Sequence, residues 1–368
     1  LNEEGSGAGN QGVYASTFTY DVNVPTAVLV TPVHFSYRKS GAITTISGTA
    51  ADWIRNSAGV NNVQQINLYV KFSSASTYLT ASGWVSGLTA IPISTAGLPY
   101  GATWGTPITE AYLAHNTTYT VWVEARDLAG NLQNSFIVGT SSNTFNYDTA
   151  EPVSAITSVT DLAFYRRENI PNITGTAADE SEGGRIFVSS YSIQDTNLSV
   201  YWNGSTFSAG TETFFPMTFQ GNNVWSDSMM TSNLVDGRTY GLRFLAVDKA
   251  QNTETPSGAD PHYRTFKFDV STPTTQINTP SNGAYVNSLA TVTFSATDNM
   301  IAASSLFKVE YSIYVDTGGY YRRGANDFNA TTQYFNPAVS TMANLTFSYA
   351  DNIPWVTGRK YTLSSKAT

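Results

Sequence analysis

The chain has 368 residues and no cysteine, which excludes a disulfide framework and any thiolate metal site. Charged residues are also scarce, at 12% of the sequence, and the formal net charge is −8. A nucleic-acid partner would need a basic stripe, which an acidic chain of this kind does not offer. No apolar run approaches the roughly 20 residues of a membrane-spanning helix, so we expect no membrane span in this segment.

Histidine is scarce too. His34, His115 and His262 stand at unrelated positions, without a Gly-x-Ser-x-Gly motif, metal-ligand spacing or a glycine-rich phosphate loop nearby. The densest acidic run, Asp179-Glu180-Ser181-Glu182, falls within one predicted loop and favours solvated carboxylates over a catalytic pair. The sequence therefore predicts that this chain is not an enzyme.

The residues that are abundant favour β-structure. Aromatic residues make up 13% of the chain, with 22 tyrosines, and 28 glycines and 14 prolines supply turns. We expect an all-β protein with no more than a few turns of helix. The length suits about three domains of ordinary size.

An internal repeat organises the chain. Tyr119, Tyr240 and Tyr361 stand 121 residues apart, each in a strand-like segment. A second marker is an aromatic-Asp pair shortly before a proline, and a third is a strand-like segment that ends in Asp. The second marker occurs as Tyr20-Asp21 with Pro25, Tyr147-Asp148 with Pro152 and Phe268-Asp269 with Pro273. The third marker occurs at residues 46–52 and 173–179, and in a weaker form at 294–298.

The segments around the repeating tyrosines alternate with a period of two residues. Tyr119 and Val121 fall on one face of the predicted strand, and Thr120 and Trp122 fall on the other. A large apolar residue stands six positions before each tyrosine, and turn-forming residues fill the gap. These apolar residues are Leu113, Leu234 and Trp355. The spacing resembles the tyrosine corner of immunoglobulin and fibronectin type III sandwiches, in which the hydroxyl bonds upstream backbone; an ordinary core tyrosine is the alternative.

The strings ISGTAAD, ITGTAAD, ARDLAGN and AVDKAQN, with YDTAEP as a joint, resemble bacterial immunoglobulin-like repeats of large secreted or surface proteins, adhesins among them. This resemblance implies seven-stranded sandwiches and a stalk, spacer or adhesion role. The third repeat departs from the pattern at 294–296, so its second strand is the least secure.

We therefore expect three tandem immunoglobulin-like β-sandwich domains in an elongated array. Repeat 1 covers residues 22–147, repeat 2 covers 148–268, and repeat 3 covers 269–368 and lacks its final strand. Residues 1–21 align with 128–148 and correspond to the last strand and joint of a preceding repeat. Two explanations stay open: the segment is cut from a longer chain, or residues 1–21 donate a strand to repeat 3 of another copy.

Carboxylates recur at the predicted strand ends and suggest calcium sites. One Asp enters each repeat, one ends its second strand, and one closes the tyrosine strand in the first two repeats. In an immunoglobulin-like sandwich these positions share a pole, and hard oxygen ligands suit Ca²⁺. The candidates at the domain junctions are Asp21, Asp52, Asp127, Asp148, Asp179, Asp248, Asp269 and Asp298. Turn-capping aspartates are the alternative interpretation.

Aromatic side chains outside the repeat markers could bind a glycan. Trp202 and the pair Tyr320-Tyr321 are the candidates, with core packing as the alternative.

The function that these patterns favour is a structural segment of an extracellular or cell-surface bacterial fibre or stalk, with the option of head-to-tail polymerisation by strand donation. Its partners would be copies of itself or further repeats of the same chain. The alternative is an adhesin module that binds a glycan or host surface. A third class, an accessory region of a secreted hydrolase, would need a catalytic domain elsewhere.

Overall fold

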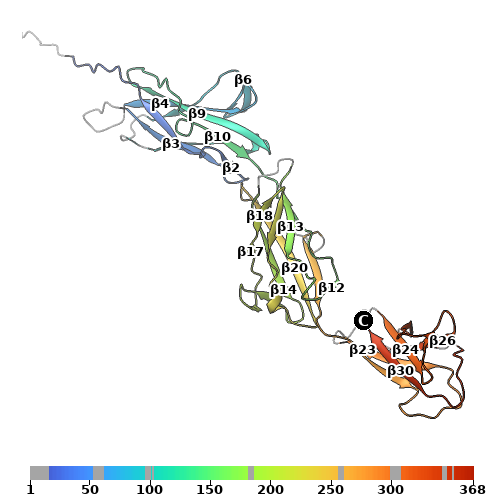
Figure 1. Ribbon diagram of the computed structural model, residues 1–368. Helices are drawn as coiled ribbons and strands as arrows, with labels where there is room; N and C mark the ends of the chain where they lie inside the picture. Colours follow the sequence, from blue (N-terminus) through green and yellow to red (C-terminus); the bar gives the residue numbers. More distant parts are fainter. Residues whose placement is uncertain are drawn as a thin grey trace, which may run out of the picture. The chain divides into compact units, whose positions relative to one another are not determined.

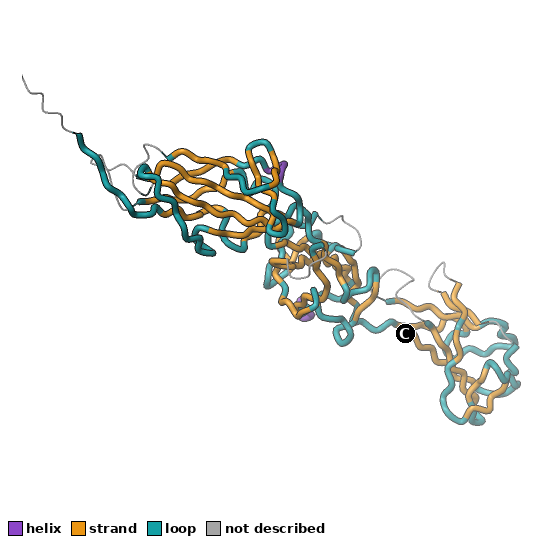
Figure 2. Tube along the Cα trace, turned by 90° about the horizontal axis from the view of Figure 1, so that it is seen from above, coloured by secondary structure: helices purple, strands orange, loops and turns teal. Residues whose placement is uncertain are grey.

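The computed structural model describes residues 16–52, 62–95, 101, 103–180, 186–255, 261–298, 308–341, 346–349 and 352–368. Within these residues the chain is built of strands, with two three-residue 3-10 helices, η1 (Glu110–Tyr112) and η2 (Thr231–Asn233) (Figures 1 and 2). The expectation of an all-β protein with very little helix is confirmed.

The chain divides into two compact units, residues 1–151 with 248–252, and residues 152–247 with 253–368. Three clusters of buried apolar side chains occupy them, one in the first unit and two in the second. The predicted boundaries at residues 148 and 269 fall just after two strands, β10 (Ser142–Tyr147) and β21 (Tyr263–Phe268). The division into three domains stays a prediction.

Two sheets enclose the core of repeat 1. One has the order β1-β3-β8, and the other has the order β2-β10-β9-β4-β5-β6, with β7 also paired to β4. The strands besides β10 are β1 (Thr26–Thr31), β2 (Ser36–Arg38), β3 (Thr45–Ala51), β4 (Val63–Phe72), β5 (Thr77–Thr80), β6 (Gly83–Ser86), β7 (Ile91–Ser94), β8 (Thr103–Pro107) and β9 (Thr117–Asp127).

Repeat 2 has the same plan. Its sheets have the orders β11-β13-β19-β18 and β12-β21-β20-β14-β15-β16, with β17 paired to β14. The strands besides β21 are β11 (Val153–Ile156), β12 (Ala163–Tyr165), β13 (Ile173–Ala178), β14 (Ile186–Asp195), β15 (Val200–Trp202), β16 (Phe207–Ala209), β17 (Phe215–Pro216), β18 (Thr218–Gly221), β19 (Val224–Asp227) and β20 (Arg238–Asp248).

In repeat 3 the sheets have the orders β22-β23-β29-β28 and β26-β25-β24-β27, and β30 pairs with β24. The strands are β22 (Thr274–Thr279), β23 (Val292–Thr297), β24 (Val309–Val315), β25 (Tyr320–Arg322), β26 (Asp327–Ala330), β27 (Asn336–Pro337), β28 (Val339–Thr341), β29 (Thr346–Tyr349) and β30 (Tyr361–Ala367). The second strand of this repeat, which was the least secure, is present as β23 and buries Phe294.

The course of the first strands identifies the fold. In repeat 1, β1 pairs antiparallel with β3 in one sheet, and the chain then crosses so that β2 pairs parallel with β10 in the other. Repeat 2 does the same with β11, β13, β12 and β21. Two packed, mainly antiparallel sheets are typical of immunoglobulin-like sandwiches when the first segment of the chain pairs with one sheet and then crosses to the other. Each proline of the second sequence marker stands directly before the first strand of its repeat, where a missing N–H is tolerated.

The alternating pattern predicted for the tyrosine strands is confirmed. Along β9 the side chains of Tyr119, Val121 and Val123 are fully buried, and along β20 those of Tyr240 and Leu242 are fully buried. Because successive residues of a strand point to opposite faces, their neighbours face outward. Each sandwich core thus receives one face of its central strand.

The tyrosine corners are present as well. The backbone N–H of Ala114 donates to Tyr119 Oη at 2.7 Å, and that of Val356 donates to Tyr361 Oη at 2.7 Å. In each case the donor follows the large apolar residue that precedes the tyrosine by six positions, and repeat 2 has the same bond. The hydroxyl therefore ties the entry loop to the strand.

The tyrosine strands of the first and third repeats differ in their pairing. Among the described residues, β30 pairs with β24 on one side only, whereas β9 pairs with both β4 and β10. Most of the segment predicted to be a joint or donor strand, residues 1–15, lies outside the described residues, and residues 16–25 carry no strand.

Candidate functional site

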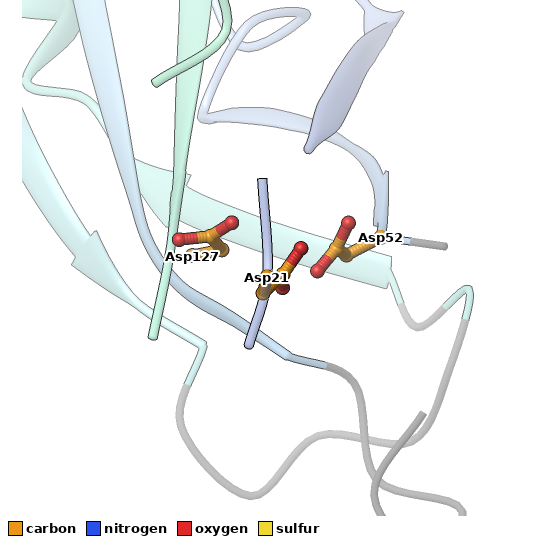
Figure 3. A group of neighbouring side chains, drawn as sticks. All are labelled: Asp21, Asp52 and Asp127. Atoms are coloured by element: carbon orange, nitrogen blue, oxygen red, sulfur yellow. The ribbon is translucent and has the colours of Figure 1, made fainter. Parts of the chain in front are cut away.

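Three carboxylates predicted to converge do so at one end of the first sandwich. Asp52 directly follows β3, Asp127 ends β9, and Asp21 lies in the segment that leads into β1 (Figure 3). One carboxylate oxygen from each lies within 4.8 Å of the others. Asp52 and Asp127 are buried, and Asp21 is partly buried. The antiparallel course of the sandwich brings these strand ends to one pole.

An asparagine that the sequence analysis did not single out fixes this arrangement. The backbone N–H of Asn131 donates to Asp127 Oδ1, and its side-chain Nδ2 donates to Asp127 Oδ2, both at 2.8 Å. The same Nδ2 donates to the backbone carbonyl of Asp21 at 3.1 Å. Asn131 thus holds the carboxylate of one strand end and the backbone of the entering segment together.

The donor set fits a hard divalent cation. Asp21 Oδ1 accepts the N–H of Asn23, but Asp21 Oδ2 is buried and accepts no hydrogen bond within the described part of the chain. A buried carboxylate oxygen without a donor is costly unless a cation compensates its charge. Three carboxylates at this separation offer the oxygen ligands that Ca²⁺ prefers.

Asn252 repeats the hydrogen bonds of Asn131 one period later. Its N–H and its Nδ2 donate to the two carboxylate oxygens of Asp248 at 2.8 Å, and Nδ2 donates to the carbonyl of Asp148 at 3.1 Å. Asp148 and Asp248 are buried. Asp179, which directly follows β13 as Asp52 follows β3, is also buried.

The pKa of Asp248 records the electrostatic cost of this arrangement. Burial raises the pKa above the ordinary value of 3.8, and the charge of Asp148 adds to the rise, although the hydrogen bonds from Asn252 oppose it. A raised carboxyl pKa means that the ionised form is disfavoured in the fold. A bound cation would remove this penalty.

Repeat 3 brings two of its predicted carboxylates together. The hydroxyl of Ser271 lies within hydrogen-bond distance of both, at 3.2 Å from Asp269 Oδ1 and 3.0 Å from Asp298 Oδ1. Burial raises the pKa of Asp269, and the charge of Asp298 raises it further. Asp269 thus resembles Asp248 of repeat 2, whose pKa is also raised by burial and by the charge of a neighbouring aspartate.

Two of the aromatic candidates for glycan binding are buried, which corrects the expectation of exposed rings. Trp202 is 7% exposed and packs on Phe207, and Tyr321 is 1% exposed and belongs to the core of repeat 3. Tyr320 is partly exposed and packs on Tyr314. Trp202 and Tyr321 therefore offer no face to a sugar.

The reason is an equivalence between repeats that the sequence comparison missed. Tyr78, Tyr201 and Tyr320 occupy the same place in the hairpin strand that pairs with β4, β14 or β24. Because strand residues alternate, the residue after each of these tyrosines points into the core. These inward residues are Leu79, Trp202 and Tyr321. A tyrosine followed by a bulky apolar residue was the available signal.

The histidines have structural contacts. His34 Nδ1 accepts the N–H of Thr144 at 3.1 Å, and His115 Nδ1 accepts that of Thr149 at 3.0 Å. His262 Nδ1 lies 2.9 Å from Glu254 Oε1.

Ser154 donates to Glu254 Oε2 at 2.6 Å, so the carboxylate stands between the serine and His262. Nucleophilic catalysis needs the base beside the hydroxyl, and Ser154 is fully buried. This group joins three segments of a sandwich and has the wrong order for a catalytic triad.

No protein-family model matches the chain, and no curated protein matches it. Solved structures do resemble it. Fibronectin(III)-like modules of CbhA from Clostridium thermocellum align with 66% of this chain and 94% of theirs, at 14% identity and a TM-score of 0.30. A structure concerning host cell surface retention of a 1.5-MDa bacterial ice-binding adhesin aligns with 90% of this chain and 92% of its own, at 13% identity and a TM-score of 0.30.

A tetra-tandem repeat from the extending region of a large adhesion protein aligns with 94% of this chain and 74% of its own, at 14% identity and a TM-score of 0.27. The immunoglobulin-like fold of the present chain is identified from its own sheet order and cores.

No helix among the described residues is long and apolar enough to cross a membrane.

Proposed function

We propose that this chain is a structural segment of an extracellular bacterial stalk or fibre, built from tandem sandwiches whose strand ends bind Ca²⁺. The observation that supports it is the recurrence of one clamp. Asn131 and Asn252 make the same three hydrogen bonds, with the same distances, one repeat apart. A feature that recurs at the entry of successive repeats suits a chain whose role is to space and extend.

Calcium would act in this proposal as a crosslink between segments. Asp21, Asp52 and Asp127 would supply its carboxylate ligands in the first unit, and Asn131 keeps Asp127 and the entering backbone in place. The ion would join the segment before β1 to the ends of β3 and β9. Asp148, Asp179 and Asp248 are proposed for the same role in repeat 2, and Asp269 and Asp298 in repeat 3.

The calcium part is tested by thermal unfolding of the full chain in EDTA and in millimolar CaCl₂. Because an ion that binds only the folded state stabilises it, the melting temperature is expected to rise with calcium. Asp127→Asn should reduce the rise, whereas Asp327→Asn, which removes a partly exposed ion pair with Arg322, should leave it unchanged. A melting temperature that is the same in both buffers would remove calcium from the proposal.

The stalk part is tested separately, by stretching single molecules of the full chain. Independent sandwiches should unfold one at a time, and each should release a contour length of about 3.6 Å per residue. A single event that releases the whole chain at once would contradict a tandem array, whatever the calcium result.

Strand donation between copies is a further part of the proposal. The outer edge of β30 has no partner strand among the described residues, and open strand edges readily accept another strand. Residues 1–21 would add to it from a neighbouring copy. If a chain that lacks residues 1–21 forms the same filaments as the full chain, donation by this segment is wrong.

A further inference from the structure

The first repeat carries a hollow on the outer face of its larger sheet. The hollow is open to solvent and has a volume of about 660 Å³. Its lining includes Thr118 and Thr120 of β9, Thr144 and Asn146 of β10, and the aromatic residues Phe35 and Tyr37. None of these residues belongs to the carboxylate cluster described above.

Several of the polar side chains that line the hollow already form hydrogen-bonded pairs. Thr118 Oγ1 donates to Asn146 Oδ1 at 3.1 Å, and the hydroxyls of Ser73 and Thr120 lie 2.8 Å apart. Each hydroxyl can both donate and accept, and the amide offers two donors and an acceptor. A ligand rich in hydroxyl groups would find complementary partners here.

Phe35 is the unusual residue of the lining. Its side chain is 76% exposed, and its backbone lies in the left-handed region at φ +58°, which favours glycine. A backbone hydrogen bond from the Phe35 N–H to Thr144 O, at 2.8 Å, holds the chain in this conformation. The conformation therefore does not need the phenylalanine side chain. Gly283 occupies this place in repeat 3, three residues after a Thr-Pro pair as Phe35 is, with φ +74°.

The Phe35 ring packs on the neighbouring His34 ring, with their centroids 3.8 Å apart, but it stays largely exposed at a backbone position that favours glycine. Such strained positions often have a functional reason. Phe35 and Tyr37 line the hollow together with the threonine hydroxyls and the Asn146 amide. Aromatic rings next to hydroxyl and amide groups are complementary to a sugar, which has apolar C–H faces and polar edges.

The rest of this face agrees with such a ligand. On the outward face next to the hollow, Lys71 of β4 lies opposite Thr120, and Tyr69 lies opposite Trp122. Tyr69 and Trp122 stack with their ring centroids 4.9 Å apart. A protein partner would require a larger apolar surface.

Charge distinguishes between classes of glycan. Among the described residues that line the hollow, the single charged one is Lys249, which follows β20 and belongs to the first compact unit. Its ammonium lies 5.7 Å from the centroid of the Tyr37 ring. The chain as a whole carries a net charge of −8, which disfavours polyanions. We infer that the hollow bounded by Phe35, Tyr37, Thr120 and Asn146 is a binding site for a neutral glycan.

The test uses the labelled full chain on an array of neutral and acidic glycans, followed by titration with a neutral glycan that binds. Phe35→Gly should weaken binding about tenfold or more, because it removes an aromatic anchor. It should not lower the melting temperature, because glycine suits the backbone conformation. Thr120→Val should also weaken binding.

Leu162→Gly is the matched control. Leu162 occupies the equivalent position of repeat 2, at φ +61°, and its N–H donates to Thr265 O at 2.7 Å. It should leave glycan binding unchanged. The inference is overturned if no glycan on the array binds, if only acidic glycans bind, or if Phe35→Gly binds as well as the unmodified chain. None of these outcomes depends on calcium or on the proposed stalk role.

Discussion

Tyr240 Oη accepts the backbone N–H of Val235 at 2.8 Å, across a loop that contains the left-handed Gly237. The ring of Tyr240 is fully buried, and burial raises the pKa of its hydroxyl. The hydroxyl therefore stays neutral and remains an acceptor throughout the physiological pH range. This single bond fixes the entry of β20 into the sandwich.

Removal of this hydroxyl should destabilise repeat 2. Tyr240→Phe leaves the partly buried N–H of Val235 without its partner, which should lower the free energy of unfolding by about 1–2 kcal/mol. Chemical denaturation of the full chain measures the change. Tyr165→Phe is the control: Tyr165 Oη accepts the exposed N–H of Thr160, so its loss should cost less. Equal losses for the two variants would show that the corner has no special role.

Gly48 should not tolerate a methyl group. A Cβ at this position would collide with the carbonyl oxygen of Val28 on one side and the Trp104 ring on the other. Because the obstacle includes backbone, Gly48→Ala should destabilise repeat 1 by about 2–3 kcal/mol in chemical denaturation. At Gly105, next to Trp104 on β8, the nearest atom would be 3.4 Å away, so Gly105→Ala should change stability little. A similar cost at both positions would contradict the close packing.

The carboxylate pair of repeat 3 predicts a pH dependence with a definite sign. The folded state raises the pKa of Asp269 above 3.8, so its ionisation opposes folding at neutral pH and ceases to do so below its pKa. Without calcium, Asp269→Asn should therefore raise the melting temperature at pH 7. The gain should vanish as the pH falls toward about 4. A gain that is the same at both pH values would mean that charge is not its cause.

Asn131 should be a positioning residue for the proposed calcium site. Asn131→Ala removes the side-chain hydrogen bonds to Asp127 and to the Asp21 carbonyl, so the calcium-induced rise in melting temperature should shrink. Asn67→Ala removes an exposed-face bond to Glu124 in the same repeat and should preserve the rise. If both variants lose the same part of the calcium response, the clamp does not position the ligands.

Much of the fold could be predicted because its signals are local. The period-two pattern around Tyr119 identifies a half-buried strand, and the six-residue offset from Leu113 identifies the corner. The order of the aspartates along each repeat also predicted that Asp21, Asp52 and Asp127 would converge, because strand ends of a known sandwich lie at known poles.

Other features depend on contacts between segments that are distant in sequence. The strings ARDLAGN and AVDKAQN repeat an asparagine four residues after an aspartate, but this local spacing does not indicate that Asn131 reaches Asp21 across 110 positions. The hollow beside Phe35 exists because β2, β9 and β10 lie side by side in one sheet.

The sequence by itself determined the strand-rich composition, the repeat of 121 residues and the faces of the tyrosine strands, since alternation and spacing are properties of a short stretch of chain. Only the tertiary structure decided that Trp202 and Tyr321 face the cores while Tyr320 stays partly exposed. The face that a hairpin residue occupies depends on its register with the neighbouring strand, and that register is set by pairing across the sheet.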